Sequence, residues 1–410
     1  KGLSYTNQEI LINVFSRYDD INTSVIESEY SELINDICIE KNRIEYLSSD
    51  HKASSIFSGH IKNEKIIKKI NKWIDEKESF SPTRLEKITY SRFIFLLEEI
   101  LNVENEEILD DFTDKRVSGK VIHEMLKKIY TDFRDKDLEI GLDRKWVFYD
   151  KNIWKLSKNK ISKNCYPVFH LDCSKLDEVL NYLKKEIDNI FHYVISDLEY
   201  KIISKFGEKE FWEIEQKKIK ENVISLVKFD FESSKEKNIY PFEFEYYFGP
   251  NAKTKINMFN LPISGIIDRI DLCFDKNNNL TEIHVLDYKS KSSRKKQIEE
   301  VEKAANCQLI IYAFAAQQLF FDKYNSEKIN DIIKISNFPY SEEKPNKDYF
   351  RTEKVMIPLN YPGLIDQFTQ SLQANVEMLR NGNFSVDPYY KRYNNYESIL
   401  RNNAKELLDN

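Results

Sequence analysis

The chain has 410 residues, of which 41% are hydrophobic and 32% are charged, and its formal net charge is -6. This composition is typical of a soluble globular protein with one large or two modest domains and enough apolar residues for a core. The net charge neither favours nor excludes nucleic acid as a partner, because phosphate binding depends on local basic surface.

The cysteines and the apolar runs predict a cytoplasmic protein. The five cysteines lie far apart and form no C-x-x-C pair, which argues against a disulfide framework and against a thiolate zinc site. No signal peptide is visible, and the longest apolar run, LIIYAFAAQQLFF, is too short to span a bilayer. The chain begins with Lys1 rather than methionine, so we expect a fragment of a longer protein.

The first part of the chain is predicted to be mainly helical. Residues 1–79 have the pattern of mixed helix and loop and end in a charged helix. Residues 80–101 begin with a helix-start signature, because Ser81 can cap the helix and Pro82 suits its first position. Further helices are predicted, by apolar residues at helical spacing, over residues 119–130 and from about 176 to 231.

The period then changes to that of β-strands. Strands are predicted over 240–249, 261–274 and 281–289, and the turn-rich DKNNN joins the last two into a hairpin. A helix over 302–320, a strand over 354–359 and a closing helix over 361–382 are predicted to follow. The expected fold is α/β, with a central mixed sheet of four or five strands flanked by helices and a large helical insertion at about 131–240.

Two aspartates and a lysine interrupt the apolar faces of the predicted hairpin. Residues two apart on a strand point the same way, so Asp287 and Lys289 share a face with apolar residues, and Asp268 does so on the preceding strand. A carboxylate at the edge of a core needs compensation, and converging aspartates form a hard oxygen site suited to Mg²⁺ or Mn²⁺. Ordinary salt bridges are the alternative: Asp287 with Lys289 at a strand end, and Asp268 with Arg269 or a neighbouring lysine.

The order of several segments resembles a known family. GIIDRIDL, VLDYKSK and QLIIY resemble the motifs of the RecB-like branch of the PD-(D/E)XK nuclease superfamily, whose core is restriction-endonuclease-like. GKVIHEML resembles the family's G-x-x-x-H helix and PFEFEYYFG its E-x-x-F strand. SPTRLEKITYSRFIFLLEEIL is similar to the segment that opens the nuclease domain of AddB-type helicase–nuclease subunits. The resemblance runs from about Phe80 to the C-terminus.

The resemblance implies roles for individual residues. The metal ligands would be His123, Asp268, Asp287 and the backbone carbonyl of Tyr288, with Lys289 as the catalytic lysine. Three further residues complete the implied site: Gln308 and Tyr312, which would position DNA or support the lysine, and Glu245, an outer-shell member. Arg269 and Asp271 face the other side of their strand, and we expect a structural salt bridge there.

One departure concerns an iron–sulfur cluster that many AddB-type nucleases carry on four cysteines. The aligned positions here are Ser91, Lys391, Asn394 and Leu400, and none is cysteine. We therefore expect no cluster, and a C-terminus closed by packing instead.

The basic stretch KSKSSRKK follows the predicted catalytic strand. Lys291, Arg294, Lys295 and Lys296 are candidate DNA-phosphate contacts, with a solvated charge run as the alternative. Domain boundaries are expected at residues 1–79, the possible tail of a helicase-like region, and 80–410, the nuclease domain.

The resulting hypothesis is a metal-dependent deoxyribonuclease that hydrolyses phosphodiester bonds. The AddB-type resemblance implies an exonuclease that acts in DNA double-strand break repair beside a helicase partner subunit. The chain has no P-loop, so it cannot supply ATP-driven unwinding by itself. A catalytically silent DNA-binding or scaffold module on the same fold is the alternative, and the intact Asp268, Asp287 and Lys289 argue against it. Length and the missing cysteines disfavour a CRISPR-associated four-cysteine nuclease.

Overall fold

A computed structural model describes residues 59–103, 115–150, 153–196, 209–235, 237–289, 294–321, 326–339, 347 and 350–384. The chain divides into two compact units, of which the larger comprises Lys65–Tyr90 and Glu106–Arg380. Within this described part of the chain, no helix is both long and apolar enough to cross a membrane.

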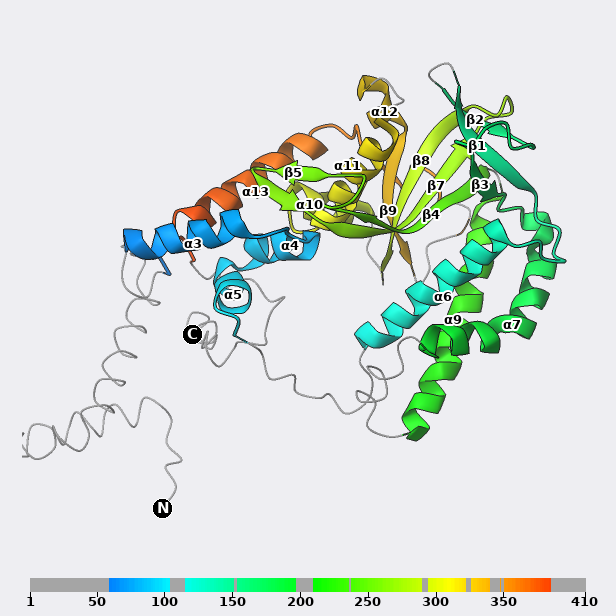
Figure 1. Cartoon of the computed structure of the whole chain (residues 1–410), viewed down its shortest axis with the longest axis horizontal. Helices are drawn as coiled ribbons and strands as arrows, with labels where there is room; N and C mark the ends of the chain where they lie inside the picture. The colour runs from blue at the N-terminus through cyan, green and yellow to red at the C-terminus, as the bar shows by residue number, and fades with distance from the viewer. Residues whose placement is uncertain are drawn as a thin grey trace, which may run out of the picture. The chain divides into compact units, whose positions relative to one another are not determined.

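A five-stranded mixed sheet forms the centre of the larger unit, with strand order β10-β9-β8-β7-β4. Figure 1 labels β9, β8, β7 and β4 of this sheet. Only β8 and β9 run parallel, and the other neighbours are antiparallel. This confirms the predicted α/β fold with a mixed sheet of four or five strands. The strands are β4 (Asn238–Phe248), β7 (Gly265–Phe274), β8 (Leu280–Lys289), β9 (Ile333–Pro339) and β10 (Ile357–Pro358).

The predicted hairpin is the middle of this sheet. β7 and β8 pair antiparallel from Phe274↔Leu280 to Arg269↔Leu286, across the turn at Asp275–Asn279. Asp275 holds that turn, because its Oδ1 accepts hydrogen bonds of 2.8 Å from the backbone N–H groups of Asn277 and Asn279.

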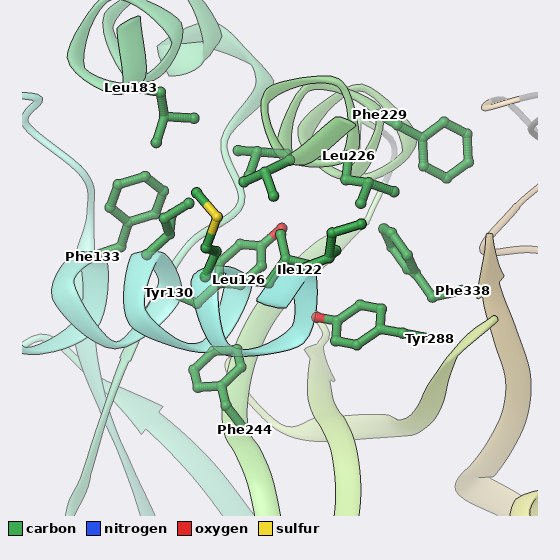
Figure 2. Packing of buried hydrophobic residues seen from close by; sticks show 14 of the residues in the cluster. Ile122, Leu126, Tyr130, Phe133, Leu183, Leu226, Phe229, Phe244, Tyr288 and Phe338 are labelled. Carbon is green, nitrogen blue, oxygen red and sulfur yellow. The ribbon is translucent and has the colours of Figure 1, made fainter. Parts of the chain in front are cut away.

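Three long helices form a layer on one side of the sheet: α6 (Lys115–Asp135), α7 (Leu176–Ser196) and α9 (Lys209–Ser233). Within this layer, α7 packs on α6 and α9. Their apolar faces meet Leu286, Tyr288 and Phe338 of β8 and β9 in one buried cluster. Figure 2 shows Tyr288 and Phe338 beside side chains of the helices. Tyr130 of α6 stacks on Phe244 of β4 with ring centroids 5.4 Å apart. This packing explains why residues 119–130 carry apolar side chains at helical spacing.

The opposite face carries α11 (Cys307–Phe321), which contacts β7, β8 and β9. α11 also packs on α4 (Pro82–Tyr90), and α13 (Leu364–Arg380) packs on α4 and on α10 (Arg294–Glu302). α12 (Ser326–Ile332) precedes β9 and contacts α11. α3 (Glu64–Glu76) joins the same unit, where Asn71 Nδ2 donates to the Arg380 carbonyl at 3.0 Å.

The insertion before β4 contains more than helices. A three-stranded antiparallel sheet of order β2-β1-β3 precedes the 3₁₀ turn η2 (Cys173–Lys175) and α7. Its strands, for which the sequence analysis made no prediction, are β1 (Arg144–Asp150), β2 (Ile153–Ser157) and β3 (Tyr166–Phe169). Between β4 and β7, a short two-stranded sheet pairs β5 (Ile256–Met258) with β6 (Leu261–Ile263).

Two predicted helices are interrupted in the structure. The helix predicted over 302–320 was placed too early, because α10 ends at Glu302 and Ala304 takes a left-handed φ of 52° before α11 begins at Cys307. The segment predicted over 80–101 is α4, where Ser81 Oγ accepts from the Arg84 N–H at 3.2 Å, then α5 (Arg92–Phe95) and a π-helix (Leu96–Ile100). These last two belong to the smaller unit, in which Arg92 Nε donates to the Asn383 carbonyl at 2.9 Å.

A fully buried ion network lies beneath the three-helix layer. Arg269 donates to Asp271 at 2.6 Å and to Asp230 of α9 at 2.7 Å. Arg351 also joins the two acids, at 2.8 Å from Asp271 and 2.5 Å from Asp230. The expected structural role of Arg269 and Asp271 therefore agrees with their contacts.

Candidate active site

The site forms where β7 and β8 part. Pairing of the two strands ends at Arg269↔Leu286, whereas β8 continues beside β9 to Lys289. Asp268, just before Arg269, and Asp287, just after Leu286, are the first residues beyond this last pair. Asp268 Oδ2 bridges the opening by accepting the Tyr288 backbone N–H at 2.6 Å.

His123 of α6 and Glu245 of β4 bring further ligand atoms to this opening. His123 Nδ1 lies 3.5 Å from Glu245 Oε1 and 3.7 Å from Asp268 Oδ1. The three ligand atoms all lie within 4.8 Å of one another. Glu245, which we expected in an outer position, is thus placed as close to His123 as Asp268 is.

The backbone of β4 is unusual at Glu245. Its φ is 50°, in the left-handed region that non-glycine residues rarely adopt. Such a departure within a strand redirects a side chain, and strained backbone of this kind gathers at functional sites.

The electrostatics of these residues call for a cation. Burial and the charge of Asp287 raise the pKa of Asp268 well above its usual value. Burial opposes protonation of His123, but its hydrogen bond with Glu245 and the nearby aspartates outweigh burial and raise the pKa of His123. Glu245 Oε1 and Asp287 Oδ2 are buried, and their near cationic neighbours are His123 Nδ1 at 3.5 Å and Lys289 Nζ at 3.0 Å. Carboxylate oxygens with one imidazole therefore fit a divalent metal such as Mg²⁺ or Mn²⁺.

Lys289 lies on the opposite edge of the opening. Its Nζ is 3.0 Å from Asp287 Oδ2 and donates to Gln308 Oε1 of α11. Burial disfavours the charged form of Lys289, but the negative charges of Asp287 and Glu86 outweigh burial and raise the pKa of Lys289. Gln308 Nε2 lies 3.5 Å from the Tyr312 hydroxyl, so the lysine, the amide and the phenol form a chain.

The glycine of the GIIDRIDL segment has a packing reason. A Cβ at Gly265 would lie 2.8 Å from the Phe248 ring and 3.4 Å from the Tyr312 ring. Phe248 and Tyr312 are themselves packed edge to face, with centroids 6.0 Å apart. Because Gly265 has no side chain, the rings of Phe248 and Tyr312 can pack closely against the start of β7.

Glu86 of α4 is a site neighbour that the sequence analysis missed. It is buried, and its Oε1 accepts the backbone N–H groups of Cys307 and Gln308 at 2.9 and 3.4 Å. The available signal was an acid on the apolar face of α4, between Leu85 and Ile88, which are both buried.

The candidate DNA contacts are only partly described. Lys291 lies outside the described residues. Arg294 donates to the Met356 carbonyl at 3.4 Å and lies over the Tyr361 ring. Lys295 and Lys296 are exposed on α10, where each lies 3.8 Å from a glutamate four residues on, Glu299 or Glu300.

A cavity of about 840 Å³ lies at the turn end of β7 and β8, lined there by Phe274, Asp275 and Glu282. Cys273, Glu282 and His284 cluster beside it. Lys237 and Lys334 already neutralise Glu282 at 2.8 and 2.9 Å, and burial raises the pKa of the Cys273 thiol to about 12. This cluster does not fit a metal.

Comparison with known proteins identifies the family. The sequence matches the PD-(D/E)XK nuclease superfamily over residues 79–394, and the chain belongs to this superfamily. Its members are generally metal-dependent nucleases. No curated protein matches the chain.

The expected absence of an iron–sulfur cluster concerns four positions, of which one is described. Ser91 caps α5, with its Oγ accepting the Ile94 N–H at 3.3 Å. Lys391, Asn394 and Leu400 lie outside the described residues.

Proposed function

We propose that the chain is a metal-dependent deoxyribonuclease that hydrolyses phosphodiester bonds. The observation that carries this proposal is the convergence of His123, Glu245 and Asp268 at one opening of the sheet, with Lys289 and Asp287 paired at its other edge. Carboxylates so close to one another repel, and a metal cation between them would relieve that repulsion.

Mg²⁺ or Mn²⁺ would be held by Asp268, Asp287, His123 and the Tyr288 carbonyl, and we add Glu245 to this set. A metal there would polarise the phosphodiester and lower the pKa of a bound water. The protein's own part is to exclude solvent from Asp268 and to hold the imidazole of His123 against two carboxylates.

Lys289 is proposed as the catalytic lysine. Its raised pKa keeps it protonated, so that it can orient the attacking water or offset the negative charge that develops on the phosphate. Gln308 and Tyr312 keep its Nζ in place.

The finer assignment rests on motif order. We propose an AddB-type nuclease domain over residues 80–410 that acts as an exonuclease in double-strand break repair, with residues 1–79 as the tail of a helicase-like region. Since the sequence has no P-loop, a helicase partner would supply unwinding. Arg294, Lys295, Lys296 and Lys291 would follow the DNA backbone.

The test is cleavage of end-labelled single-stranded and double-stranded linear DNA with Mg²⁺, Mn²⁺ or EDTA. The unmodified protein should cleave only with metal, and Lys289→Ala should lose roughly 100-fold or more in rate. Lys217→Ala, at an exposed lysine of α9, is the matched control. DNA binding without cleavage under every condition would instead favour the silent module.

A further inference from the structure

α4 and the start of α11 are joined by two side chains one helical turn apart. Glu86 Oε1 accepts the N–H groups of Cys307 and Gln308, at 2.9 and 3.4 Å, and the Tyr90 hydroxyl donates to the Ala305 carbonyl. Both side chains are buried. Residues 86 and 90 lie on the same face of α4, so the helix holds this turn at two points.

The turn that they hold needs such support. Ala304 has a left-handed φ of 52°, and α11 begins three residues later. The first N–H groups of a helix have no partner within the helix, and a carboxylate there satisfies them and complements the helix dipole.

The same turn sets the position of Gln308. Its backbone N–H is bonded to Glu86, and its side-chain Oε1 accepts from Lys289 Nζ. A displacement of the first turn of α11 therefore moves the acceptor that orients the lysine.

We propose that Glu86 is a positioning residue for Lys289, which acts through the first turn of α11 and Gln308. The inference rests on the proposed nuclease function. The charge of Glu86 also raises the pKa of Lys289, but a lysine is protonated at neutral pH without that help. The effect of Glu86 on the rate therefore comes from the place of its acceptor oxygen.

Two substitutions of Glu86 separate the effect of where its acceptor oxygen lies from the effect of its negative charge. Glu86→Gln keeps an acceptor oxygen at the same distance from the backbone and removes the charge. Glu86→Asp keeps the charge but withdraws the acceptor by about 1.5 Å, the length of one carbon–carbon bond. Positioning predicts that Glu86→Gln retains kcat within about threefold, whereas Glu86→Asp loses roughly 10- to 100-fold in kcat with little change in KM. Glu221→Ala, at an exposed glutamate of α9, is the control.

A double-mutant cycle of Glu86→Asp with Gln308→Ala tests whether Glu86 acts on Lys289 through Gln308. If Glu86 acts through Gln308, adding Glu86→Asp to Gln308→Ala causes little further loss of kcat. Additive losses in folded variants, or the reverse order in which Glu86→Asp is active and Glu86→Gln is not, would overturn the proposal.

Hydrogen exchange of residues 305–312 gives a readout that needs no activity. Exchange there should rise in Glu86→Asp and stay near that of the unmodified protein in Glu86→Gln. If the unmodified protein cleaves no DNA, the proposed function fails, while this pattern of exchange still supports the positioning of Gln308. Unchanged exchange in Glu86→Asp would refute the positioning itself.

Discussion

Asp268 is held among like charges, in contact with His123 and near both Asp287 and Glu245. Burial and these acids raise its pKa, so the ionised form is disfavoured in the metal-free protein. A metal ion that binds the folded state alone stabilises it by mass action. In the proposed metal site, the residue that destabilises the metal-free protein would therefore also be one that makes metal binding favourable.

We expect Mg²⁺ or Mn²⁺ to raise the melting temperature of the unmodified protein. At a metal concentration of 100 times Kd the gain is about 2.7 kcal/mol. Asp287→Asn should abolish both this gain and DNA cleavage while the protein stays folded. Thermal unfolding with metal and with EDTA measures the effect, and an equal gain in the variant would remove Asp287 from the metal site.

Asp268→Asn should stabilise the metal-free protein, and more so at higher pH. Because the folded-state pKa of Asp268 lies above its unfolded value, the wild-type penalty is absent below about pH 4 and grows as pH rises through that folded-state pKa. The Asn side chain can still accept the Tyr288 N–H. Urea unfolding in EDTA at several pH values checks the sign, and a stability difference that shrinks as pH rises would contradict it.

At the scale of elements, α6 serves the site and the core at once. Its first half carries His123 to the carboxylates, while its second half packs Tyr130 and Phe133 into the cluster of Figure 2. Tyr130 also donates to Asp230 of α9 at 2.8 Å, and Asp230 joins the buried arginines. The ion network therefore links α6, α9 and β7 beside the candidate site.

Asp230→Ala should destabilise the fold by about 3–5 kcal/mol, because it leaves Arg269 and Arg351 buried with one carboxylate between them. Asp188→Ala, which removes an exposed partner of Lys220, should cost less than about 1 kcal/mol. Equilibrium unfolding in urea compares the two. Equal losses would show that the buried network contributes no more than a surface pair.

At the scale of the whole molecule, α3 belongs to the larger unit although it precedes the expected boundary at residue 79. Ile70 and Ile74 are buried, and Arg380 of α13 pairs with Asp75 at 2.8 Å. The helix is therefore part of the unit that contains the site.

A chain that lacks residues 1–79 should be less stable than one that lacks only residues 1–63. The two isoleucines of α3 contribute about 1.5–3 kcal/mol each when buried. Thermal and urea unfolding of the two truncated proteins measure the difference. Indistinguishable stability would mean that α3 is not needed by the larger unit.

The sequence by itself determined the local features of this protein. Alternation of apolar and polar residues predicted the β7–β8 hairpin, and the order of motifs predicted the superfamily. Both are local signals, because strand and helix periods are set by neighbours in the chain.

Only the tertiary structure decided which distant groups meet. The contact of Glu86 with Gln308 joins residues that are 222 positions apart, and no period encodes it. The left-handed backbone at Glu245, which coincides with its approach to His123, and the break before α11 are likewise invisible in the residue types. Such features depend on packing between elements, where the cost of a strained backbone is offset by contacts that the local sequence does not contain.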